Sequence, residues 1–210
     1  MSTEPFTDQQ IAQLTKAFHR GASEASTALA QWLHAPMSIS IDAVDQCPLE
    51  SALSVLGEGD NAVCMVLMEM EGLLTGHMLL AFDDVSGLGL SDMLLSRPKG
   101  TATSWEELER SCVMETMNIA GSAYLNGIAH YLSEGCDERG ELIPSPPQFL
   151  RDFAESLLQS AFMEQALFAR EVVFAKARFD LSGQPLRWTF LLIPDPASLE
   201  TLAEILNRLS

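Results

Sequence analysis

Positive charge is scarce in this chain. Its 210 residues include 12 Lys and Arg against 29 Asp and Glu, which gives a net charge of −17 at pH 7. Nucleic-acid backbones and anionic lipid surfaces attract basic patches, and the sequence contains no run of Lys or Arg. We therefore expect neither a nucleic acid nor a membrane surface among the partners of this protein.

Paired cysteines and targeting signals are also missing. The four cysteines form no Cys-x-x-Cys pair, so the sequence predicts neither a zinc site nor a disulfide framework. The first ten residues lack the basic start and apolar core of a signal peptide. The longest stretch free of Asp, Glu, Lys and Arg, residues 116–133, contains Asn118, Ser122, Asn126 and His130 and is too polar to span a membrane. These absences indicate a soluble, reduced, cytoplasmic protein.

Hydrophobic residues make up 47% of the chain, enough for a sizeable core, and we expect one domain spanning residues 1–210. Helical spacing predicts helices over residues 8–33, 85–95, 148–161 and 198–209. The first has Thr7 or Asp8 as its cap and Pro36 as its stop. A Ser-x-x-Glu capping box at 104–107 predicts a further long helix that continues to about Leu132.

Strand patterns alternate with these helices. They cover residues 37–44, 61–70, 73–82, 171–181 and 186–193. Glu71-Gly72 and residues 182–185 read as the turns of two hairpins. The resulting order of elements predicts an α+β fold with a loose internal duplication, its halves running from about 8 to 100 and from 104 to 210.

One polar stripe on the long helix stands out as a candidate site. Ser111, Glu115, Asn118 and Ser122 are separated by four, three and four residues, which places them on one helical face. The opposite face is apolar and is expected to meet the core through Val113, Met117, Ala120, Tyr124, Ile128 and Tyr131. An ordinary solvent-facing helix has the same spacing, so the pattern alone does not distinguish a site from a surface.

The run from Glu115 to Asn126 resembles the second active-site helix of the CheC family of chemotaxis phosphatases. That family's motif is Asp or Ser, three residues, Glu, two residues and Asn, followed by a proline. Ser111, Glu115 and Asn118 match it, while Pro144, Pro146 and Pro147 come a few residues late. The resemblance implies a CheC-like fold, an antiparallel sheet with long helices packed on it.

The same resemblance implies hydrolysis of the phosphoaspartate of a CheY-like response regulator. Asn118 would then orient the attacking water, and Glu115 would pair with the regulator's active-site lysine. Ser111 and Ser122 would lie in the partner-binding surface. No cofactor of the protein's own is expected, because the regulator supplies Mg²⁺. A CheD-like protein is a second candidate partner.

The first helix carries a degenerate copy of the motif. Lys16 stands where the family has Glu, His19 where it has Asn, and Ala12 replaces the acidic or hydroxyl position. We therefore expect one functional site. Two alternatives remain open: a non-catalytic CheC-like binding module in chemotaxis or the flagellar switch, and an unrelated α+β enzyme.

Overall fold

The computed structural model describes residues 6–48, 62–136, 140–153, 156–157, 171–181, 184–186 and 188–209. Its helices are α1 (Asp8–Leu33), α3 (Asp84–Leu94), α4 (Glu107–Leu132) and α6 (Pro196–Arg208), with a short 3₁₀ turn, η2, at Ser133–Gly135. All four lie where the sequence predicts them. Within the described residues, no helix is long and apolar enough to cross a membrane.

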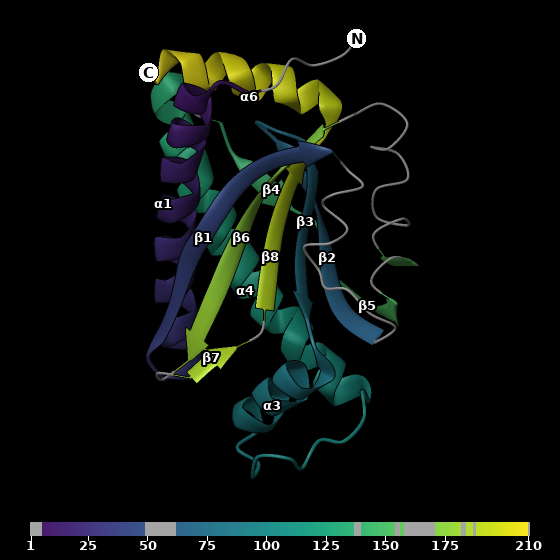
Figure 1. Ribbon diagram of the computed structural model, residues 1–210. Helices are drawn as coiled ribbons and strands as arrows, with labels where there is room; N and C mark the ends of the chain where they lie inside the picture. Colours follow the sequence, from purple (N-terminus) through teal and green to yellow (C-terminus); the bar gives the residue numbers. More distant parts are fainter. Residues whose placement is uncertain are drawn as a thin grey trace.

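The strands are β1 (Met37–Pro48), β2 (Ala62–Gly72), β3 (Gly76–Phe82), β4 (Leu142–Pro144), β5 (Gln148–Phe153), β6 (Glu171–Leu181), β7 (Gln184–Leu186) and β8 (Trp188–Pro194). Their pairings are antiparallel: one sheet has the order β1-β6-β7, and the other has β4-β2-β3-β8 with β5 also paired to β2. β6 and β8 lie side by side, so the two sheets follow one another across the molecule (Figure 1). The predicted α+β class with antiparallel strands is confirmed.

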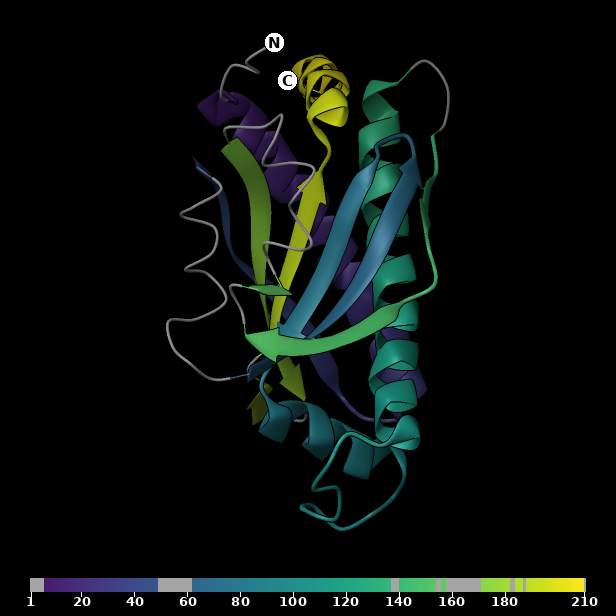
Figure 2. The ribbon, with the colours of Figure 1, turned by 90° about the vertical axis from the view of Figure 1, so that its right-hand side faces the viewer.

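Two long helices cover one side of these strands. α1 and α4 pack against each other, while α6 lies across one end of the molecule and α3 at the other (Figures 1 and 2). Tyr124 of α4 lies in the centre of this core, with its ring 6.3 Å from that of Phe18 and 4.5 Å from that of Phe190. α6 is fixed to α1 by Gln10 and Gln13, whose side-chain amides donate to backbone carbonyls near the C-terminus.

The N-terminus of α1 forms as its sequence predicts. Thr7 is the cap, and it forms a reciprocal capping box with Gln10. The predicted capping box of α4 is wrong. α4 begins at Glu107 after an N-cap at Glu106, and the Ser104 hydroxyl donates to the Glu106 carboxylate instead. Trp105 is held by a hydrogen bond to Asp84 and by its contact with the Phe149 ring, and the backbone is extended at Glu106, so the helix starts only after it.

Residues 148–161 were expected to form a helix, and this prediction is wrong for the first six. Residues 148–153 form β5, which pairs with β2 from Ala62 to Leu67. Residues 154–155 and 158–161 lie outside the described part of the chain, and residues 156–157 between them are helical. The apolar spacing of this segment suits a helix, but β2 offers a row of backbone donors and acceptors, and such long-range pairing overrides local preference.

The first predicted turn and the second predicted hairpin need correction, although the pairing of Leu181 with Gln184 reverses the chain within the second predicted turn. Glu71 and Gly72 belong to β2, where they pair with β4, and the chain turns over residues 73–75. In the second case β6 pairs with the short β7, whereas β8 pairs along its length with β3. Ser182 and Gly183, in the predicted turn, lie outside the described residues. Residues 186–193 therefore do not form a simple hairpin with 171–181.

Candidate functional site

The polar stripe on α4 is a surface feature. Ser111, Glu115 and Asn118 are exposed, and Ser122 is half-buried. Residues three and four apart on a helix have their Cβ atoms about 5–6 Å from each other, so the carboxylate of Glu115 and the carboxamide of Asn118 are neighbours. The four predicted residues share one face, as their spacing indicates.

The opposite face of α4 meets the core. Its buried side chains include Val113, Met117, Ala120, Tyr124 and Ile128, while Tyr131 is half-buried. Because this face is packed against α1 and the sheet, the rotation of the helix about its axis is fixed. The stripe is therefore presented to solvent by a rigid element.

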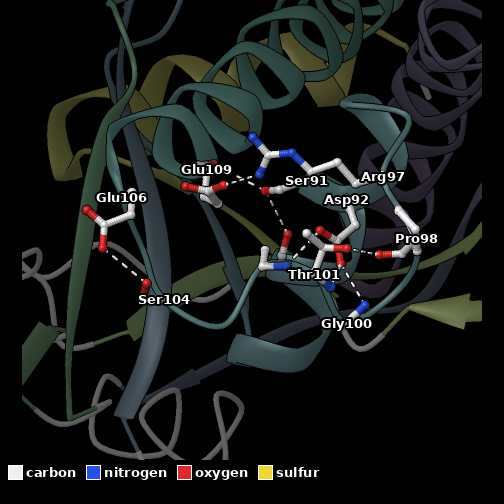
Figure 3. A network of polar contacts seen from close by, with 11 residues as sticks. Ser91, Asp92, Arg97, Pro98, Gly100, Thr101, Ser104, Glu106 and Glu109 are labelled. Atoms are coloured by element: carbon white, nitrogen blue, oxygen red, sulfur yellow. Dashed lines mark hydrogen bonds and ion pairs between the residues drawn. The ribbon is translucent and has the colours of Figure 1, made fainter.

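The start of α4 is joined to α3 by a buried polar cluster (Figure 3). Glu109, 5% exposed, forms an ion pair of 2.8 Å with Arg97, which follows α3. Ser91 of α3 donates to the backbone carbonyl of Glu109 across 3.3 Å. These contacts fix the first turn of α4, one turn before Ser111.

The loop between α3 and α4 is held by a single carboxylate. Asp92, 1% exposed, accepts from the backbone N–H of Gly100, Thr101 and Ala102 at 2.7, 2.9 and 2.8 Å (Figure 3). A buried carboxylate needs several donors to offset its lost hydration, and this loop supplies them from its backbone. The loop is therefore an ordered part of the structure next to the candidate site.

A second polar cluster centres on Asp84, the first residue of α3. It accepts from Trp105 Nε1 at 2.7 Å, from Arg151 Nε and Nη2 at 3.0 and 2.9 Å through its two oxygens, and from Cys64 Sγ at 3.2 Å. The hydrogen bonds from Arg151 hold the Asp84 pKa well below its usual range. Burial, with Asp84 nearby, raises the pKa of the Cys64 thiol, which makes it a poor nucleophile.

This cluster continues into an aromatic group beside the first turn of α4. The rings of Trp105 and Phe149 are 4.9 Å apart, and the guanidinium of Arg110 lies 5.7 Å from the centre of the Phe149 ring. Arg110 Nε also donates to the Trp105 carbonyl at 3.1 Å. Arg110 is thus exposed but held in position, and it directly precedes Ser111.

Comparisons of sequence and of structure with known proteins find relatives of the same kind. Over 199 residues the chain is 23% identical to the CheY-P phosphatase CheC of Bacillus subtilis (strain 168), covering 93% of this chain and 92% of that protein. It matches Thermotoga maritima FliY with a TM-score of 0.74 at 17% identity, covering 99% of this chain and 100% of that one. The chain has the CheC-like fold.

Two further solved structures share this CheC-like fold. The FliM middle domain from H. pylori matches with a TM-score of 0.65 at 11% identity, covering 95% of this chain and 99% of that one. A chain of the CheX–CheY–BeF3–Mg²⁺ complex from Borrelia burgdorferi matches with a TM-score of 0.52 at 15% identity, covering 85% and 96%. No protein-family model matches the CheC-like chain.

α1 of this CheC-like chain has an exposed face with the same residue spacing as the α4 stripe. Ala12, Lys16, His19 and Ser23 are exposed on α1, each 99 residues before Ser111, Glu115, Asn118 and Ser122. The Lys16 ammonium is 3.2 Å from Gln13 Oε1. This face therefore carries a cation where α4 carries a carboxylate.

Sequence reasoning overlooked the contacts that surround the stripe. Asp84 lies 21 residues from Trp105 and 67 from Arg151, and Arg110 lies 39 from Phe149, so no local sequence pattern indicates these contacts. The contact between Trp105 and Phe149 could not be predicted from sequence, because the two residues are distant along the chain and only the fold brings them together. The described residues contain no group of three or more His, Cys, Asp or Glu arranged to hold a metal ion.

Proposed function

We propose that this protein hydrolyses the phosphoaspartate of a CheY-like response regulator at the exposed face of α4. The observation that supports this most directly is that Glu115 and Asn118 are both exposed on one face of a rigid helix in a CheC-like chain. The resemblance to a CheY-P phosphatase over nearly the whole chain supports the same reaction.

Asn118 is the proposed water-positioning residue. A carboxamide accepts a hydrogen bond from water through its oxygen and donates to a phosphoryl oxygen through its nitrogen. A water held in line with the acyl phosphate bonds to phosphorus as the bond from phosphorus to the aspartyl oxygen breaks. The products are the aspartate carboxylate and inorganic phosphate, which keeps both protons of the water as H2PO4−. Asn118 acts by orientation, without titrating.

Glu115 is the proposed docking residue. One turn from Asn118, its carboxylate is exposed and suited to pair with the active-site lysine of a regulator. The hydroxyls of Ser111 and Ser122 flank this pair and complete the proposed partner-binding surface. Gly121, next to Ser122, is buried and faces the sheet, where a Cβ atom would lie 2.5 Å from Met78 Cε, so it takes no part in this surface.

In this proposal the regulator, not the phosphatase, binds the Mg²⁺ that the reaction needs. Mg²⁺ bound there would neutralise charge on the phosphoryl oxygens, which is why the phosphatase adds only water positioning and access. No covalent intermediate forms on Glu115 or Asn118. The proposed place of action is the cytoplasm, and a CheD-like protein remains a second proposed partner.

We infer that the two halves, 8–100 and 104–210, are related copies and that only the second keeps a phosphatase site. The buried residues of α1 recur in α4 at a constant offset: Leu14 and Val113 are related by 113 − 14 = 99, and Phe18 and Met117 by 117 − 18 = 99. Lys16 at the position of Glu115 would repel a regulator lysine, so the α1 face lacks the proposed chemistry.

A second candidate function is a non-catalytic binding module. It is favoured by the TM-scores, which are higher for FliY and FliM than for the CheX–CheY complex, and by the degenerate face on α1. In that case α4 would dock a regulator or a flagellar-switch protein without accelerating dephosphorylation.

The test is the decay rate of a phosphorylated response regulator from the same cell, measured with Mg²⁺ in the presence and absence of this protein. Asn118→Ala should abolish the acceleration and leave the melting temperature unchanged. Asn126→Ala, an exposed asparagine two turns further along α4, is the matched control and should keep full activity. Binding without acceleration by the wild type would favour the binding module.

A further inference from the structure

Arg110 differs from the other arginines around the start of α4. Arg97 is paired with Glu109, and Arg151 is paired with Asp84. Arg110 forms no ion pair with any residue that the structure describes, in a protein with 29 acidic residues and a net charge of −17. It is also the sole Lys or Arg of α4. An exposed charge of this kind remains available to a partner.

The guanidinium is held in place. Its Nε donates to the Trp105 carbonyl at 3.1 Å, and its Cζ lies 5.7 Å from the centre of the Phe149 ring, within the range of a cation–π contact. Trp105 is fixed in turn by its bond to Asp84. Because Nε is already hydrogen-bonded, the two Nη groups remain available for bidentate pairing with a partner. The side chain is already held in place, so it loses little conformational entropy when it binds.

Arg110 also lies within reach of any partner that docks on the stripe. At about 1.5 Å per residue, its Cα is about 7.5 Å along the helix axis from that of Glu115. A typical stable interface covers about 800 Å² on each partner, a patch roughly 30 Å across. At 3.6 residues per turn, Arg110 is rotated about 80° around the helix axis from Asn118, so a patch of this width centred on Glu115 and Asn118 includes Arg110 at its edge.

We propose that Arg110 binds a carboxylate side chain of the docked regulator and helps to determine which regulator this protein accepts. The inference rests on the proposed function, because it takes a regulator to be the partner of this face. A guanidinium fork matches a carboxylate in geometry and charge. It provides local attraction on a surface whose net charge otherwise repels acidic proteins.

The test compares Arg110→Ala with Lys176→Ala, an exposed residue on β6 whose loss makes the same charge change. Binding is measured with the regulator both phosphorylated and unphosphorylated, and turnover with the phosphorylated form. Arg110→Ala should raise Kd about tenfold for both forms and raise KM without lowering kcat, as loss of a charge-assisted hydrogen bond predicts. Lys176→Ala should change neither constant.

Two further variants separate charge from geometry. Arg110→Lys keeps the charge but loses the fork, and it should bind with intermediate affinity. Arg110→Glu should bind more weakly than Arg110→Ala. Melting temperatures equal to that of the wild type would exclude unfolding as the cause of any loss.

The remaining outcomes are distinct. Unchanged Kd and KM in Arg110→Ala, with activity still lost in Asn118→Ala, would overturn the role of Arg110 and leave the phosphatase proposal standing. Weakening confined to the phosphorylated form would overturn the carboxylate as its ligand. If the wild type does not accelerate decay, the phosphatase proposal fails, and the binding measurements alone decide whether Arg110 docks the partner. Absence of any binding by the wild type would overturn both.

Discussion

Gly127 of α4 and Gly21 of α1 meet backbone to backbone where the two helices pack. A Cβ atom on Gly127 would lie 2.8 Å from the Gly21 Cα, and one on Gly21 would lie 2.7 Å from the Tyr124 carbonyl oxygen. Backbone atoms on both sides leave no flexible side chain to move aside. This contact sets how closely α1 and α4 approach.

Gly127→Ala should therefore destabilise the protein by about 1–3 kcal/mol, because overpacking outweighs the better helix propensity of alanine. Thermal unfolding would measure it as a fall in Tm of several degrees. Gly89→Ala on α3 is the control, since a Cβ there meets nothing within 4 Å, and it should raise stability slightly. An unchanged Tm for Gly127→Ala would contradict the close contact.

Tyr124→Phe should leave the protein as stable as the wild type or make it more stable, by up to about 1 kcal/mol. The Tyr124 hydroxyl is fully buried and has no hydrogen-bond partner among the described residues, so removing it relieves an unpaired polar group. The companion variant Tyr131→Phe breaks the 2.6 Å bond from the hydroxyl to Gln13 and should lower stability. Urea midpoints compare the two, and a clear loss for Tyr124→Phe would mean that the hydroxyl has a partner.

Asp84 should contribute a pH-dependent part of the stability. Its pKa in the folded protein is held below the usual 3.8, chiefly by hydrogen bonds from Arg151. This stability is fully present above about pH 4 and is lost as the pH falls through the folded value. The difference in unfolding midpoint between wild type and Asp84→Asn should shrink from pH 6 to pH 3. Arg151→Ala should behave in the same way, and a constant difference would contradict the ion pair.

Glu115→Lys should weaken regulator binding about tenfold or more, since it replaces attraction to a lysine with repulsion. Glu200→Lys on α6 makes the same charge change at an exposed helical position and serves as the control. Titrations of both variants with a phosphorylated regulator provide the comparison. Equal affinities for Glu115→Lys and wild type would argue against the lysine-pairing role.

The helices were predictable from sequence because their signals are local. Thr7 and Gln10 cap α1 through each other, and the heptad-like spacing of Val113, Met117 and Tyr124 places the stripe on the solvent side of α4. Burial of one helical face needs no knowledge of what covers it. The exposure of Glu115 and Asn118 followed from that spacing, whereas their roles remain predictions.

The failures of prediction involve distant contacts. β5 was read as a helix because its apolar spacing suits one, and only pairing with β2 makes it a strand. The Ser104 capping box does not form, and Trp105 beside it is bound to Asp84, 21 residues earlier. The fixing of Arg110 depends on Phe149 and the Trp105 carbonyl, a combination that no local motif encodes.

The strands of the two halves are intermixed across the molecule, and this constrains how the protein can be made. β1 pairs with β6, and β3 pairs with β8, so each of these ladders joins residues more than 100 positions apart. During synthesis, these ladders can form only after β6 and β8 have left the ribosome, so β1 and one edge of β3 stay unpaired until then. A gene fragment encoding the first half alone would leave those edges unpaired. The protein therefore depends on its C-terminal strands to protect its N-terminal ones from aggregation.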